Sequence, residues 1–116
     1  MILCSGEALI DMLPRESAQG EPCFTPVPGG AVFNTAIALA RLGAPAALFT
    51  GLSRDLFGRR LAAALAADGV DAGLAVRSDR PTTLAFVDLT DGQASYAFYD
   101  EATAARSLTT ADLPHE

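Results

Sequence analysis

The chain has 116 residues, half of them hydrophobic and 19% charged, which is the composition of one folded domain with a modest core. Its net charge of −6, with no basic cluster, argues against nucleic acid and anionic membranes as partners. All eight basic residues are arginine, so a lysine-dependent phosphate loop and a Schiff-base lysine are both excluded.

Other side chains limit the function further. The one histidine, His115, is the penultimate residue, so we expect neither histidine acid–base chemistry nor a histidine metal site. Cys4 and Cys23 are far apart in sequence and are expected to be reduced and inert. Because no stretch approaches the ~20 apolar residues of a membrane span, we expect a cytoplasmic protein.

The first quarter of the chain is predicted to be extended. A strand is predicted at residues 2–6, and a second apolar segment follows at 7–13 and is expected to end at Pro14. Residues 15–21 are polar and form a predicted loop. The short segment 24–27 lies between prolines, which restricts it to an edge strand or a loop.

Alternating helices and strands follow. The spacing predicts an apolar helix over 31–42 that is buried on most sides and ends at Gly43, and then a buried strand over 45–52. Asp55 is placed to cap a second helix running to residue 68, and we favour this capping role over a ligand contact. A further short strand is expected after residues 71–76, so the pattern is that of a parallel sheet with crossover helices.

After Pro81 the apolar pattern indicates a β-hairpin. Residues 83–90 and 94–99 flank Asp91-Gly92, a dipeptide typical of two-residue hairpin loops. One side of this ribbon is apolar or aromatic throughout, so it should cover something or pair with another chain. No closing helix or strand is expected in residues 102–116. The predicted cross-strand pairs are Ala85 with Phe98, Val87 with Tyr96, and Leu89 with Ala94.

The paired glycines Gly29 and Gly30 and the amide of Asn34 form the most informative motif. Glycines allow a close backbone approach or a positive φ. Asn34 stands one turn into an apolar helix, and we expect it to be a buried polar group that needs a partner. That partner is either the backbone of the protein itself or a polyhydroxylated ligand.

Six motifs, in order and in register, resemble those of the ribokinase-like (PfkB) sugar kinases, and of fructokinases in particular. The resemblance extends over essentially the whole chain. The motifs are Gly6-Glu7-Ala8-Leu9-Ile10-Asp11, Gly29-Gly30 with Asn34, Ala40-Arg41-Leu42-Gly43, Gly51 with Asp55 and Gly58, Arg80-Pro81-Thr82-Thr83, and Tyr96-Ala97-Phe98-Tyr99 with the following Asp100-Glu101-x-Thr103-Ala104.

The resemblance implies an α/β fold with a ribokinase-like parallel sheet, flanking helices and a β-ribbon lid. Residues 1–116 would be the N-terminal part of a single kinase domain, with lid segments at about 9–28 and 83–99. The lid of such kinases often mediates dimerisation, which implies a homodimer through the ribbon.

The resemblance also implies which residues bind the sugar. Asp11, Gly29, Gly30 and Asn34 would line the pocket, and Phe98 would close over the ring. A carboxylate and an amide can satisfy sugar hydroxyls, a glycine admits the ring against the backbone, and an aromatic face covers C–H groups.

The catalytic half of such a kinase is not represented. The Gly-Ala-Gly-Asp stretch that carries the base and the anion hole, and the Asn-x-x-Glu motif tied to the metal, do not occur in this sequence. We therefore expect the base beyond Glu116, no catalytic residue or metal ligand within the chain, and no activity of this part alone. ATP and Mg²⁺ would serve the complete enzyme at sites largely outside this chain.

The function expected for the complete protein is phosphoryl transfer from ATP to D-fructose. One alternative is another sugar, such as ribose or 2-keto-3-deoxygluconate, and another is a non-catalytic sugar-binding fragment. A dinucleotide oxidoreductase is excluded because no Gly-x-Gly-x-x-Gly follows the first strand. The sequence leaves the role of Arg106 open.

Overall fold

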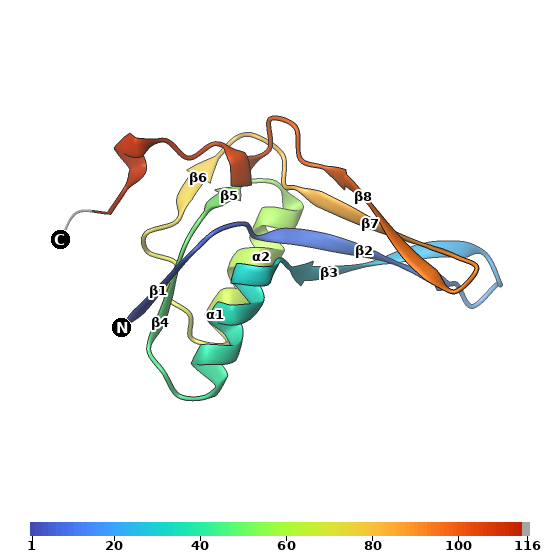
Figure 1. Ribbon diagram of the computed structural model, residues 1–116, viewed down its shortest axis with the longest axis horizontal. Coiled ribbons are helices and arrows are strands. Elements are labelled where there is room, and N and C mark those ends of the chain that lie inside the picture. Colours follow the sequence, from blue (N-terminus) through green and yellow to red (C-terminus); the bar gives the residue numbers. More distant parts are fainter. Residues whose placement is uncertain (115–116) are drawn as a thin grey trace.

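The computed structural model describes residues 1–114, so the prediction about His115 lies outside the described residues. The described residues form two parts (Figure 1). Parallel strands and two helices make up the body, and a sheet of four strands extends away from it, giving the molecule its long dimension of 52 Å.

The body contains short parallel strands joined through crossover helices, as predicted. β1 (Ile2–Ser5) pairs with β4 (Ala46–Phe49), and β5 (Gly51–Ser53) pairs with β6 (Val76–Ser78). The predicted single strand over 45–52 is therefore interrupted at Thr50. Backbone hydrogen bonds of Asp71 with Ala46 and Leu48 nevertheless join the segment before β6 to β4.

The two helices begin and end close to the predicted residues. α1 (Ala31–Arg41) is followed by Gly43 at φ +88°, and α2 (Leu56–Ala67) by Gly69 at φ +74°. Within residues 1–114, no helix has the length and apolar character needed to cross a membrane. The buried core is formed by side chains from the body strands, both helices and the start of β2, including Cys4, Ile10, Phe33, Leu48, Leu52, Leu61 and Leu65.

The prediction that α1 is buried on most sides is wrong. Only Phe33 and Ala36 are buried in this helix, and Asn34 is exposed. Successive helical residues are ~100° apart, so the side that carries Phe33 faces the core while Asn34 turns away from it. The burial expected for Asn34 is therefore corrected.

The four-stranded sheet, which we call the projecting sheet, has the strand order β3-β2-β7-β8. Its strands are β2 (Leu9–Glu16), β3 (Pro22–Gly29), β7 (Leu84–Thr90) and β8 (Gln93–Tyr99). β2 pairs with β7 in parallel over three residues, and the other two neighbouring pairs are antiparallel.

The first hairpin is longer than predicted. β2 does not end at Pro14 but continues to Glu16, and β3 has eight residues rather than the short segment 24–27. Pro14 is tolerated because the pairing with β7 ends at Met12. The turn is closed by the Ser17 hydroxyl, which accepts hydrogen bonds from the backbone N–H groups of Gln19 and Glu21.

The second hairpin has the predicted loop and register. The three predicted cross-strand pairs are all present, and the loop residues Asp91 and Gly92 have φ of 52° and 76°. Two successive positive φ values are typical of a type I′ turn, which suits the twist of a two-stranded ribbon.

A set of hydrogen bonds fixes the β7–β8 hairpin to the body. Asp55 caps α2 as predicted, because its carboxylate accepts from the Gly58 N–H at 2.8 Å, and it also accepts from the Thr82 N–H at 2.9 Å and the Thr82 hydroxyl at 2.6 Å. The buried hydroxyls of Thr83 and Thr103 are 2.7 Å apart. The start of the hairpin is thereby attached to the body, and its two ends are joined to each other.

The segment after β8 contains two 3₁₀ helices, η1 (Ala104–Arg106) and η2 (Thr110–Asp112), where no helix was predicted. η1 packs against β5, where a Cβ at Gly51 would collide with the Ala104 carbonyl oxygen. A single 3₁₀ turn of three residues is too short to produce a recognisable apolar pattern in the sequence.

Replacing Asp55 by alanine should destabilise the protein at neutral pH. The change removes the N-cap and leaves two Thr82 donors without their acceptor, so we expect a loss of about 2 kcal/mol in the free energy of unfolding. Asp79→Ala is the matched control, because Asp79 forms only an exposed ion pair with Arg54 and should cost less than about 0.5 kcal/mol. Urea unfolding measures both.

The effect of Asp55→Ala should also depend on pH. Burial opposes ionisation of Asp55, but the hydrogen bonds from Thr82 and Gly58 outweigh it and lower the pKa of this carboxyl. A group whose pKa is lower in the folded state stabilises above the unfolded-state pKa, and this contribution is lost as the pH falls through the folded-state value. The difference between wild type and Asp55→Ala should therefore shrink in acid, and an equal difference at all pH values would contradict the assignment.

Candidate functional site

Asp11 and Gly29 are brought into contact at the base of the projecting sheet. Asp11 lies in β2 opposite Val27 of β3, and its side chain is half-buried. A Cβ at position 29 would collide with Oδ2 of Asp11. Glycine at this position therefore leaves the room that the carboxylate occupies.

Gly30 permits a second close approach. It has φ +108°, and a Cβ on it would lie 2.7 Å from the carbonyl oxygen of Glu7. Gly30 is the N-cap of α1, and no side chain caps this end of the helix. The first-turn N–H groups of α1 therefore begin beside the Asp11–Gly29 contact without a side-chain acceptor.

Asp11 also shares a row with an aromatic side chain. Asp11 pairs with Ala85 of β7, and Ala85 pairs with Phe98 of β8. Paired residues project from the same side of a sheet, so Val27, Asp11, Ala85 and Phe98 lie on one face, which we call the Asp11 face. The small, buried Ala85 is thus the only side chain between the carboxylate and the aromatic ring in this row.

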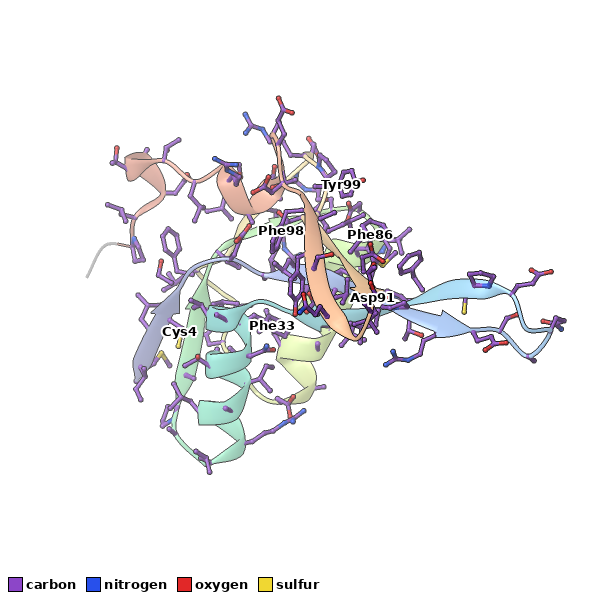
Figure 2. All side chains as sticks on the ribbon, turned by 45° about the vertical axis from the view of Figure 1, so that its right-hand side comes forward. Cys4, Phe33, Phe86, Asp91, Phe98 and Tyr99 are labelled. Atoms are coloured by element: carbon purple, nitrogen blue, oxygen red, sulfur yellow. The ribbon has the colours of Figure 1, made fainter. Side chains whose placement is uncertain are left out.

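Phe98 stands at the open end of this row. It is 58% exposed and stacks on Tyr96 with the ring centroids 6.0 Å apart. Figure 2 shows Phe98 and Phe86 on opposite sides of the β7–β8 hairpin, in agreement with the register. Phe98 is therefore available to a ligand on the side where Asp11 lies.

Asn34 lies on α1, outside the projecting sheet. Its side chain is exposed and forms no hydrogen bond among residues 1–114. It lines a cavity of about 310 Å³ between α1 and α2, which is bordered by the ion pair of Arg41 with Asp68. The structure thus unites Asp11, Gly29 and Phe98 on one sheet and leaves the Asn34 amide exposed beside it.

The electrostatics of Asp11 differ from those of Asp55. Desolvation raises the pKa of the Asp11 carboxyl above its ordinary value. A carboxylate that is partly desolvated gains from hydroxyl donors supplied by a ligand. The two aspartates therefore differ, because donors within the chain outweigh desolvation at Asp55, whereas desolvation alone shifts Asp11.

Some features of the site could not have been found from local pattern. The Ala85–Phe98 pair follows from the hairpin loop, but the pairing of Asp11 with Ala85 joins segments more than 70 residues apart.

Arg106, whose role was open, pairs with Asp100 at 3.4 Å on the surface. In residues 1–114, no group of three His, Cys, Asp or Glu side chains is arranged to hold a metal ion.

Comparison with known proteins identifies the relatives of this chain. A fructokinase from Rhizobium leguminosarum bv. trifolii is 60% identical over 114 residues, which are 98% of this chain and 35% of that protein. A crystal structure of a fructokinase with bound ATP from Xylella fastidiosa has a TM-score of 0.90 and 37% identity, covering 97% of this chain and 37% of that one.

A fructokinase from Vibrio cholerae O395 in a fructose-, ADP- and calcium-bound form has a TM-score of 0.85 and 29% identity, covering 99% of this chain and 37% of that chain. The chain therefore spans about a third of the length of the relatives that it matches. Residues 1–115 match the description "pfkB family carbohydrate kinase". With nearly every residue matched, the chain belongs to the pfkB family of carbohydrate kinases.

Proposed function

We propose that this chain is the sugar-binding N-terminal part of a fructokinase. The complete protein would transfer the γ-phosphoryl group of ATP to a hydroxyl of D-fructose, giving a fructose phosphate and ADP. The observation that carries the proposal is the Asp11 carboxylate, seated over Gly29 and in one row with Phe98. The identity to fructokinases supports the choice of sugar.

The proposed roles follow from the chemistry of each group. The Asp11 carboxylate accepts hydrogen bonds from sugar hydroxyls, and Gly29 and Gly30 let the ring approach the backbone. Phe98 covers the C–H side of the ring. The exposed Asn34 amide, which can both donate and accept, completes the set from the start of α1.

The phosphoryl-transfer step itself is assigned to residues outside this chain. Transfer needs a base for the attacking hydroxyl, donors for the phosphoryl oxygens and a divalent cation. We place the base, most of the ATP site and the Mg²⁺ site beyond Glu116, so the residues of this chain would orient the sugar in the complete protein and would not carry out the transfer themselves. A cytoplasmic location goes with a reaction that consumes ATP.

We also propose that the projecting sheet is the lid and that it mediates a homodimer. The lid would include residues 9–28 and 83–99 of the single kinase domain. Supporting this, β8 is exposed along its whole length, and Tyr96, Phe98 and Tyr99 are each at least 58% exposed. Aromatic surface of this kind usually marks a binding surface.

Asp11→Asn should lower kcat/KM for fructose by about 10- to 100-fold in the complete protein. The variant keeps the size of the side chain but loses the charge that strengthens hydrogen bonds to hydroxyls. Asp88→Asn is the matched control, since Asp88 is exposed on the opposite face of the same sheet. A coupled assay with fructose, ribose and 2-keto-3-deoxygluconate also separates the candidate sugars, and unchanged kinetics with Asp11→Asn would reject the site.

Gly29→Ala should act only through Asp11. The added methyl group displaces the carboxylate, so the KM for fructose should rise at least about tenfold. In an Asp11→Ala background, the same change should have little further effect, because the group it displaces is already gone. Additive effects of the two substitutions would show that Gly29 acts in another way.

The non-catalytic alternative has a direct test. Calorimetry of the 116-residue chain with fructose, without ATP, reports whether this part binds sugar independently. If the chain acts by itself as a sugar-binding protein, calorimetry should detect fructose binding. If no binding is detected, this alternative is rejected and the chain functions only as part of a kinase.

A further inference from the structure

Asp55 is distant from Asp11 in the sequence, but two hydrogen-bonded steps connect the two carboxylates. In the first step, the Asp55 carboxylate accepts from the Thr82 hydroxyl at 2.6 Å and from the Thr82 N–H at 2.9 Å. In the second step, the carbonyl of the next residue, Thr83, accepts from the N–H of Ile10 at 3.1 Å. Ile10 directly precedes Asp11 in β2. We call this connection the Thr82 link.

The Thr82 link is buried and lies at a short strand pairing. Thr82 is 6% exposed, and Thr83 and Ile10 are fully buried, so water does not replace these bonds when they are broken. β2 and β7 pair over only three residues, and the bond from Ile10 to Thr83 lies at the start of this pairing. A shift of one residue would move Asp11 to the opposite face of the sheet.

The start of β7 also determines where the aromatic side of the candidate site lies. β7 carries Ala85, which pairs with Phe98 of β8. The Ala104 N–H donates to the Pro81 carbonyl at 2.9 Å, so the segment after β8 is bonded to the segment before β7. A displacement of the start of β7 would therefore move Phe98 as well as Asp11.

We propose that Asp55 is a positioning residue for sugar binding, which fixes the Asp11 carboxylate and the Phe98 ring relative to each other through the Thr82 link. This inference rests on the proposed function and goes beyond the capping role of Asp55. Asp55 itself would not contact the sugar, because its carboxylate already accepts from three donors. It acts by holding the start of β7 on α2, which packs on the body.

The capping role of Asp55 can be separated from the link. Serine is as good an N-cap as aspartate, but its side chain is one atom shorter and has a single oxygen for the three donors. Asp55→Ser therefore keeps the start of α2 and removes the link to Thr82. Thr82→Val removes the hydroxyl donor alone, and Thr82→Ser keeps it.

In the complete protein, Asp55→Ser should raise the KM for fructose at least about fivefold, because the displaced Asp11 carboxylate loses hydrogen bonds to the sugar. The KM for ATP should stay within about twofold of the wild-type value, since most of the ATP site is placed outside this chain. Thr82→Val should raise the KM for fructose in the same way, and Thr82→Ser should restore it.

Ala63→Gly is the matched control for these variants. Ala63 is exposed in the middle of α2, so glycine weakens the helix without touching the Thr82 link. The KM for fructose should therefore be that of wild type. A rise equal to that of Asp55→Ser would overturn the proposal, because loss of helix stability alone would then explain the effect.

Hydrogen exchange at the Ile10 amide tests the link without any sugar. In the complete protein labelled with ¹⁵N-isoleucine, Asp55→Ser should speed exchange at Ile10 at least about tenfold relative to Ile37 of α1, because the accepting carbonyl is no longer fixed. Ala63→Gly should leave this ratio unchanged. An unchanged ratio in Asp55→Ser would overturn the link, whichever sugar the protein takes.

The two measurements separate failure of the link from failure of the proposed function. Faster exchange at Ile10 with an unchanged KM would overturn the positioning role, since the link would then not affect the sugar. The KM is measured for fructose, or for ribose or 2-keto-3-deoxygluconate where wild type prefers one of these. A wild type that phosphorylates none of them would reject the proposed function and the positioning role together, while the exchange ratio still decides whether Asp55 fixes β2.

Discussion

The parallel pairing of β2 with β7 is the contact on which the rest of the structure depends. It involves only three residue pairs, from Ile10 with Leu84 to Met12 with Phe86, yet it joins two separate hairpins into one sheet. Without it, Asp11 and Phe98 would belong to different units. The contact is held in place because Ile10 is fully buried in the core and Thr82 is hydrogen bonded to Asp55.

The two aspartates Asp11 and Asp55 differ in role because their surroundings differ. Asp55 is surrounded by donors from its own chain, which lower its pKa and make it a structural group. Asp11 is desolvated, its pKa is raised, and Gly29 leaves space for its carboxylate. The same side chain is thus a cap in one environment and a ligand-binding candidate in the other, because the surrounding donors differ.

Local sequence signals predicted the helices, the Asp55 cap and the register of the second hairpin, because each depends on residues close together in the chain. Pro14 was misleading, since a proline ends a strand only where its missing N–H is needed. The exposure of Asn34 and the row joining Asp11 to Phe98 were not predictable, because both depend on which distant segments pack together. The resemblance to sugar kinases indicated the site residues but not their arrangement.

The pKa of Asp11 is the most direct test of whether this carboxylate binds the sugar. We propose that no donor of the protein itself satisfies the carboxylate, so that it can accept hydrogen bonds from sugar hydroxyls. ¹³C NMR of the Asp11 carboxyl group in the complete protein measures its pKa with and without fructose. We expect a value above that of an ordinary aspartate in the sugar-free protein, and a lower value when sugar hydroxyls donate to the carboxylate. An ordinary or lowered pKa that does not respond to fructose would contradict the account.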